Sequence, residues 1–314
     1  MTASILFFAL GVAVLWTGTE SVLRRVPRLA AWLRVSPLVV TVLLIAVMTS
    51  LPEFCVSLLA SLRDQPSAAV GNVVGSNFVT LTFVAGLCAL WRPIVVGPTL
   101  RERESSWMIL AAALLLVLAM DGVISRLDGL ILVAAYLPYF KGTVDDARRQ
   151  RLELPVTRAA RPWLDIAIFV AGLGLIVLGS YWIVEHGTAV AREMGMSDLL
   201  VGVTFYAFGT SLPELAIALG AVLRRQADVT LGEIYASNIF TGLVVAGALC
   251  LVRPLPVEPL IVTRDLPLLI VAGVVLQMFV TSGGRFVRAE AVVMIAIFAL
   301  FLAAQFTGFS ISLP

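Results

Sequence analysis

The sequence predicts an all-α membrane protein of ten transmembrane helices, arranged as two inverted repeats of five helices. Three observations carry this prediction: the composition, the length of the apolar runs, and an internal repeat. Of the 314 residues, 60% are hydrophobic and 13% are charged, against about 25% charged residues in soluble chains. The mean hydropathy is +1.01. This composition excludes a soluble enzyme and a disordered regulator, and the net charge of +2 does not suggest nucleic-acid binding.

The apolar runs are long enough to cross a membrane. A bilayer core of about 30 Å requires about 20 apolar residues in a helix, and unbroken apolar runs favour helices over barrel strands, which alternate. The predicted spans cover residues 4–23, 36–62, 69–91, 105–121, 124–140, 164–186, 198–223, 230–252, 265–281 and 289–308. They define a first repeat over residues 1–140, a polar cytoplasmic linker over 141–163, and a second repeat over 164–314.

The basic residues indicate the orientation. If the loops after odd-numbered spans face the cytoplasm, most of the 22 Lys and Arg residues lie on that side, as the positive-inside rule requires. The exceptions are Arg63, Arg126, Arg192, Arg253 and Arg264. The sequence therefore predicts an integral protein of the plasma membrane or a bacterial inner membrane, with both termini outside.

The two halves are related in sequence. A shift of 161 positions places Thr-Ser-Leu-Pro-Glu at 49–53 on the same pentapeptide at 210–214, and about 20 of the 45 positions from 49 to 93 are identical. Ser76-Asn77 falls on Ser237-Asn238. Each half holds five spans, an odd number, so the second half enters the membrane in the opposite sense. Inverted repeats are typical of secondary transporters, with the site at the repeat interface near the midplane.

Glu53 and Glu214 lie inside apolar spans. An ionised carboxylate at the bilayer centre costs roughly 2.5–3.5 kcal/mol, so each needs a cation, a polar partner, water or a proton. The alternative is a protonated acid bonded to a neighbouring helix, but the same acid recurs in the same pentapeptide. Hydroxyls three and four residues earlier share the helix face of each acid. These hydroxyls belong to Thr49, Ser50, Thr210 and Ser211.

The prolines of the pentapeptide release backbone carbonyls. Pro52 and Pro213 lack an amide hydrogen, so the carbonyls of Met48 and Gly209 lose their helical partners. We expect carbonyls one turn back, those of Ala46 and Ala207, to be turned outward as well. Carboxylates, hydroxyls and carbonyls are hard oxygen ligands that suit Na⁺ or Ca²⁺ rather than soft metals, and the carboxylates also accept H⁺. A proline kink packed against other helices is the alternative.

The next helix of each half carries a polar stripe at positions i, i+4 and i+8. The stripes are Asn72, Ser76 and Thr80 in the first half, and Glu233, Ser237 and Thr241 in the second. A stripe that only bonds neighbouring helices together is an alternative interpretation. Because Glu233 lies near the start of its span, we expect it at the cytoplasmic mouth, with a lesser role than the two central acids.

At these residues the chain resembles the calcium/cation antiporter superfamily, and within it the sodium/calcium exchanger family. The resemblance covers essentially the whole chain. It implies exchange of Ca²⁺ for Na⁺ by alternating access, in which the first and sixth helices slide past a fixed core. It implies Glu53 and Glu214 as the central Ca²⁺ ligands, also used by Na⁺. The other candidate cation ligands are Thr49, Ser50, Ser76, Asn77, Thr80, Thr210, Ser211, Ser237, Asn238 and Thr241, with the carbonyls of Ala46 and Ala207.

Two departures from the family pattern bear on the transported ions. Thr80 and Thr241 stand where the family usually carries Asn or Asp. Two carboxylates neutralise one Ca²⁺, two Na⁺ or two protons, so we expect a Na⁺:Ca²⁺ ratio below three, or H⁺ as the counter-ion. The second departure is Met48, where the other half has Gly209; its bulk is expected to narrow access or change which cation fits.

Two other classes of protein compete with this interpretation. A cation channel could use the same polar centre, but it has no need for two opposed halves. An intramembrane enzyme could use Asp121 and Asp128, although acids at span ends are typical of turns. We therefore expect a transporter rather than an enzyme, without a resident cofactor or nucleic-acid partner, acting as a monomer in the lipid bilayer.

Overall fold

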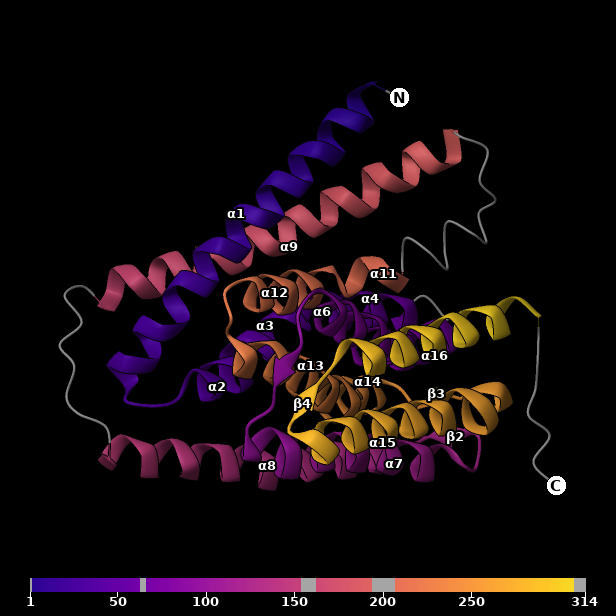
Figure 1. The fold of residues 1–314 in the computed structure, drawn as a ribbon. Helices are drawn as coiled ribbons and strands as arrows, with labels where there is room; N and C mark the ends of the chain where they lie inside the picture. The colour runs from indigo at the N-terminus through magenta and orange to yellow at the C-terminus, as the bar shows by residue number, and fades with distance from the viewer. Residues whose placement is uncertain (1, 63–65, 154–161, 194–206, 308–314) are drawn as a thin grey trace.

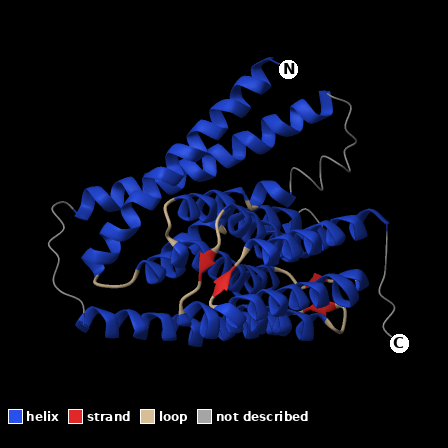
Figure 2. Cartoon of the chain, in the orientation of Figure 1, coloured by secondary structure: helices blue, strands red, loops and turns tan. Residues whose placement is uncertain are grey.

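The computed structural model describes residues 2–62, 66–153, 162–193 and 207–307. Helices make up almost all of this part of the chain, and two short antiparallel strand pairs connect loops of the two halves (Figures 1 and 2). Several helices contain a π-helical turn, denoted η, which is a feature frequent at functional sites.

The first half begins with the long helix α1. Its elements are α1 (Thr2–Leu33), α2 (Pro37–Val40), η1 (Thr41–Ile45), α3 (Ala46–Thr49), α4 (Leu51–Leu62), α5 (Pro66–Phe78), η2 (Val79–Val84), α6 (Ala85–Trp91), β1 (Ile94–Val95), η3 (Leu100–Glu104), α7 (Ser105–Ala119), β2 (Val123–Ile124) and α8 (Arg126–Glu153). Segments α2 to α4 follow one another as one kinked helix, and so do α5 to α6.

The second half repeats this order. Its elements are α9 (Pro162–Glu193), α11 (Ala207–Thr210), α12 (Leu212–Leu223), α13 (Ala227–Phe240), η5 (Thr241–Val245), α14 (Ala246–Val252), β3 (Leu255–Pro256), η6 (Ile261–Asp265), α15 (Leu266–Gly283), β4 (Arg285–Phe286) and α16 (Arg288–Thr307). Strands, π-helical turns and helix breaks of the first half thus have counterparts about 161 residues later in the second half.

Seven of the described helices are long and apolar enough to cross a membrane. They are Ala3–Leu33, Pro37–Leu62, Pro66–Trp91, Pro162–Gly187, Ala227–Val252, Ile261–Gly283 and Arg288–Gln305, and Leu212–Leu223 is a shorter apolar helix. Residues 198–206 of the predicted seventh span lie outside the described residues. The total of ten crossings therefore stays a prediction.

Several helices are longer than the predicted spans; α9, for example, ends at Glu193, seven residues beyond the predicted end at 186. Helix α1 continues to Leu33, ten residues beyond the predicted end at 23, and α8 continues through the polar residues to Glu153. Residues 141–153 of the predicted linker are therefore helical, because loss of apolar character ends a membrane span without ending a helix.

The strand pairs join the two halves. Strand β1 pairs with β4, placing Ile94 opposite Phe286, and β2 pairs with β3, placing Val123 opposite Pro256. Exchanging the two halves converts one pair into the other. Left-handed backbone at Gly122 and Gly284, with φ of +85° and +62°, precedes β2 and β4 and is a conformation that glycine adopts without strain.

Helices α1 and α9 pack along one another on one face of the bundle (Figure 1). A Cβ at Gly11 would lie 3.1 Å from the Gly179 carbonyl oxygen, and one at Gly18 would lie 2.7 Å from that of Gly172. As the residue number increases along α1, the number of the residue that it contacts on α9 decreases, so the two helices run antiparallel. Their apolar side chains form a core cluster with α2 and α12, separate from the larger cluster of the remaining helices.

In the described residues, each half places an arginine–carboxylate pair just before its fourth helix. Arg103 donates to Glu104 at 2.6 Å, and the same carboxylate accepts a hydrogen bond of 2.6 Å from Tyr139. In the second half, Arg264 donates to Asp265 at 2.7 Å. Glu104 is fully buried, so its charge depends on these contacts.

Candidate functional site

The helix breaks inside both copies of the pentapeptide. Ser50 has φ −81° and ψ 2°, and Ser211 has φ −90° and ψ 7°. Each serine separates a short helix from the next, so α4 begins at Leu51 and α12 at Leu212. Glu53 and Glu214 consequently lie in the first turn of a helix, where free backbone N–H groups and the helix dipole favour negative charge.

The two acids and their neighbouring hydroxyls are buried. Glu53 is 2% exposed and Glu214 is 1% exposed. The hydroxyl side chains that the sequence placed beside them are buried too, namely Thr49, Ser50, Thr210 and Ser211. The interior therefore holds a carboxylate and two hydroxyls from each half, as the repeat predicted.

Several oxygens at this centre have no hydrogen-bond partner among the described residues. They are Ser50 Oγ, Ser211 Oγ, Glu53 Oε2, Glu214 Oε2 and Glu233 Oε2. An unpartnered buried polar atom costs free energy, and an unpartnered carboxylate costs most. The centre is thus rich in oxygen acceptors that require a cation, a proton or water.

Glu233 belongs to this centre, which corrects its expected place at the cytoplasmic mouth. Its side chain is 0% exposed, and Thr49 Oγ1 donates to Glu233 Oε1 at 2.6 Å. Glu214 interacts electrostatically with both Glu53 and Glu233. Three carboxylates, rather than two, therefore interact at this centre.

Two asparagines next to the polar stripes, Asn77 on α5 and Asn238 on α13, bond these helices together. Asn238 Nδ2 donates to Thr80 Oγ1 at 2.7 Å, and Asn77 Nδ2 donates to the Asn238 carbonyl at 3.3 Å. The side chains of Ser76, Ser237 and Thr241 are buried in the same layer. In this conformation the two asparagine amides therefore serve helix–helix contact.

The Ala46 carbonyl is not turned outward. It accepts a hydrogen bond of 3.2 Å from the Ser50 backbone N–H and lies 3.2 Å from Thr49 Oγ1. Ala207 is the first residue of α11. Met48 is half-buried and packs against the core cluster to which α1 and α9 contribute.

Mixed oxygen donors characterise the site. Among the described residues, no three Asp, Glu, His or Cys side chains form a cluster that could hold a metal ion. The donors are instead carboxylates distributed over α4, α12 and α13, combined with hydroxyls on α3, on α11 and at the two helix breaks. Such a set suits transient binding of hard cations.

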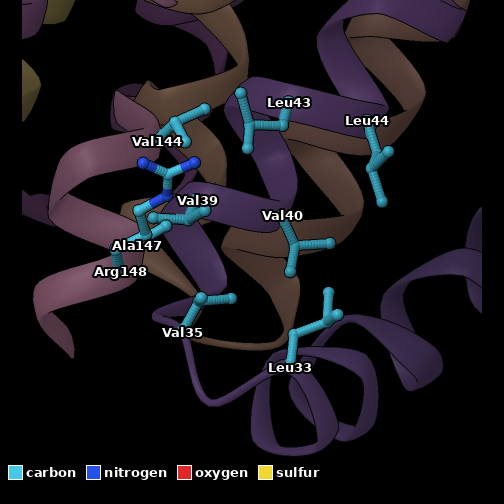
Figure 3. A pocket seen from close by; sticks show the side chains of 9 residues that line it. All are labelled: Leu33, Val35, Val39, Val40, Leu43, Leu44, Val144, Ala147 and Arg148. Atoms are coloured by element: carbon cyan, nitrogen blue, oxygen red, sulfur yellow. The ribbon is translucent and has the colours of Figure 1, made fainter. Parts of the chain in front are cut away.

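An apolar pocket is also present, and none of the three central acids is among the residues that line it (Figure 3). It has a volume of about 240 Å³ and is lined by Leu33, Val35, Val39, Val40, Leu43, Leu44, Val144, Ala147 and Arg148. Among the described residues of this lining, Arg148 alone is charged and no side chain carries an oxygen.

The acids considered for an enzyme occupy turns. Asp121 Oδ1 accepts the Val123 backbone N–H at 3.1 Å, and Asp128 Oδ2 accepts the Ser125 backbone N–H at 2.8 Å. These contacts are typical of turn and helix-capping residues.

Comparison with known proteins gives consistent matches. The model of the family described as sodium/calcium exchanger protein matches residues 3–140 and 164–307. The inner membrane protein YrbG of Escherichia coli is 33% identical over 77% of each chain. The putative antiporter CaxA of Alkalimonas amylolytica is 28% identical over 99% of this chain and 100% of its own, and the sodium/calcium exchanger MaX1 of Methanosarcina acetivorans is 26% identical over 98% and 99%.

The fold also matches solved structures. The sodium-calcium exchanger NCX_Mj soaked with 2.5 mM Na⁺ and 10 mM Sr²⁺ superposes with a TM-score of 0.85 at 27% identity, over 96% of this chain and 99% of that chain. The fold and the buried, oxygen-rich centre place this helical membrane protein in the class of cation antiporters. The chain belongs to the sodium/calcium exchanger family.

Proposed function

We propose that this protein exchanges Ca²⁺ for Na⁺ by alternating access at a midplane site between two inverted five-helix halves. Glu53 and Glu214 bind Ca²⁺ and are also used by Na⁺, and Thr49, Ser50, Thr210 and Ser211 complete the ligand set. Ten helices cross the membrane in this arrangement, and both termini lie outside.

One observation supports this proposal most strongly. Both halves contribute, at equivalent positions, buried carboxylate and serine oxygens that have no hydrogen-bond partner among the described residues. Interhelical packing alone does not require acceptors without donors. A cation that enters this centre replaces the missing partners and neutralises charges that are costly in the membrane interior.

The packing of α1 and α9 supports the inverted arrangement and the movement. These helices are the first of their halves, and their antiparallel contact through Gly11, Gly18, Gly172 and Gly179 is what oppositely inserted halves require. Their separate core cluster lets the pair slide past the remaining helices. Exchange follows if the empty, negative site resists this movement while the loaded site allows it.

The test is ⁴⁵Ca²⁺ uptake into proteoliposomes loaded with Na⁺ and diluted into Na⁺-free buffer. Uptake should require the Na⁺ gradient and disappear when monensin collapses it. Glu53→Gln and Glu214→Gln should reduce uptake to that of protein-free vesicles, whereas Glu258→Gln, at an exposed position, should transport like the wild type.

Three results would count against the proposal. Wild-type transport by either central variant would refute the site, and uptake driven only by a pH gradient would replace Na⁺ by H⁺ as the counter-ion. Uptake that rises linearly with Ca²⁺ and needs no counter-transported ion would indicate a channel.

A further inference from the structure

We infer that Glu233 is the third carboxylate of the cation site and forms a subsite for a monovalent cation, Na⁺, beside the Glu53–Glu214 pair. This inference rests on the proposed function, because it names a further ligand of the same site. The contact between the two halves at Thr49 is the observation from which it starts.

Thr49 connects Glu233 to the motif of the other half. Its hydroxyl donates to Glu233 Oε1 at 2.6 Å, while Glu233 Oε2 is buried and has no partner among the described residues. Glu53 and Glu214 both interact with Glu233 electrostatically. The unpartnered oxygen thus belongs to a carboxylate that already contacts the cation-binding motif.

The equivalent position in the first half provides an internal comparison. Asn72 corresponds to Glu233 through the sequence repeat, and its Oδ1 accepts from Thr210 Oγ1 at 3.4 Å. Asn72 Nδ2 donates to Ser57 Oγ at 2.9 Å, so both ends of the amide are satisfied. The first-half position is therefore self-contained and needs no ion.

The second half lacks that arrangement in two respects. The residue equivalent to Ser57 is Ala218, which is fully buried and provides no hydroxyl. At the same time, the neutral amide is replaced by the acid Glu233. The second half therefore lacks the hydrogen bond that joins Asn72 to Ser57 in the first half, and it carries a negative charge instead. One carboxylate oxygen of Glu233 is left for a cation.

The charge count of the site changes accordingly. The expectation of a Na⁺:Ca²⁺ ratio below three rests on two carboxylates, since Thr80 and Thr241 are neutral. With Glu233 the centre carries three carboxylates, which balance three Na⁺, or one Ca²⁺ and one monovalent cation. Glu233 lies two turns before Thr241 on the same helix face. It supplies the negative charge that the neutral Thr241 does not provide.

The experiment measures ⁴⁵Ca²⁺ bound to purified full-length protein and its displacement by NaCl, with choline chloride holding the ionic strength constant. Glu233→Gln should raise the Na⁺ concentration for half-displacement about tenfold or more and lower the Hill coefficient of displacement by about one. Glu233→Asn combined with Ala218→Ser rebuilds the first-half hydrogen bond, so it should keep the wild-type unfolding temperature and show the same loss. Glu258→Gln is the control.

A second experiment moves the negative charge from position 233 to position 241. It distinguishes a cation-binding role of Glu233 from a purely structural one. Thr241→Asp in the Glu233→Gln background returns a carboxylate to the same helix face and should recover most of the Na⁺ sensitivity. Wild-type displacement in Glu233→Gln, or a loss that Thr241→Asp leaves unchanged, would overturn the role of Glu233 and leave the proposed function standing. Absence of Ca²⁺ binding, or of its displacement by Na⁺, in the wild type would overturn both.

Discussion

The packing of α1 against α9 predicts that Gly179→Ala destabilises the protein whereas Gly174→Ala, on the same helix, does not. A Cβ at Gly179 would lie 2.5 Å from the Leu15 backbone nitrogen and 2.8 Å from both the Leu15 Cα and the Gly11 carbonyl oxygen. All three are backbone atoms, so no side-chain rotation relieves the overlap. Helices α1 and α9 must separate to accommodate the methyl group.

The size of the effect follows from the shortfall in distance. Ordinary van der Waals contact begins at 3.4 Å, so the helices must separate by roughly 1 Å, and overpacking of this kind costs about 1–3 kcal/mol. A Cβ at Gly174 meets nothing within 4 Å, and alanine favours a helix by about 0.5–1 kcal/mol over glycine. The propensity gain applies to both variants because both positions lie in α9, so the two variants should differ by the overpacking cost of about 1–3 kcal/mol.

Thermal unfolding in detergent, followed by tryptophan fluorescence, measures this difference. Gly179→Ala should unfold about 2 °C or more below Gly174→Ala, and Gly174→Ala should unfold at or above the wild-type temperature. Equal midpoints for the two variants would refute the close antiparallel contact. They would also remove the main packing argument for α1 and α9 as a unit.

Two further predictions concern buried polar contacts. Arg103→Met removes the cation paired with Glu104 and should destabilise the protein by about 3–5 kcal/mol; adding Glu104→Gln should restore most of that stability, and identical unfolding temperatures for the single and double variants would contradict the pairing. Asn238→Ala removes the amide that donates to Thr80 and should cost about 1–3 kcal/mol in the same assay, and an unchanged midpoint would show that this bond contributes nothing.

The sequence predicts the helical fold well because the relevant physical signals are local. Apolar length indicates where membrane helices lie, and the repeated pentapeptide identifies Glu53 and Glu214, whose side chains the structure buries. Helix ends are less accessible to this reasoning. The polar residues from 141 to 153 cannot remain in lipid, yet nothing prevents them from continuing α8 beyond the apolar core.

The sequence alone does not predict that Glu233 is buried at the central site. Counting residues from the start of a span places it near the membrane surface, whereas α13 is packed on nearly all sides and buries it completely. Its partner Thr49 comes from the other half, so spacing within one helix does not reveal the contact. The available signal was the repeat, because Glu233 corresponds to Asn72, whose side chain contacts the equivalent Thr210.

Simultaneous measurement of ⁴⁵Ca²⁺ entry and ²²Na⁺ exit in the same proteoliposomes tests most directly whether one shared site serves both ions. Both fluxes should saturate, stop together in Glu53→Gln, and keep a fixed ratio. Three carboxylates place that ratio at two Na⁺ per Ca²⁺ if one Na⁺ stays bound beside Ca²⁺, and at three if it leaves. A ratio above three would exceed the charge that Glu53, Glu214 and Glu233 can balance. Ca²⁺ entry without Na⁺ exit, or two fluxes that vary independently, would contradict a shared site.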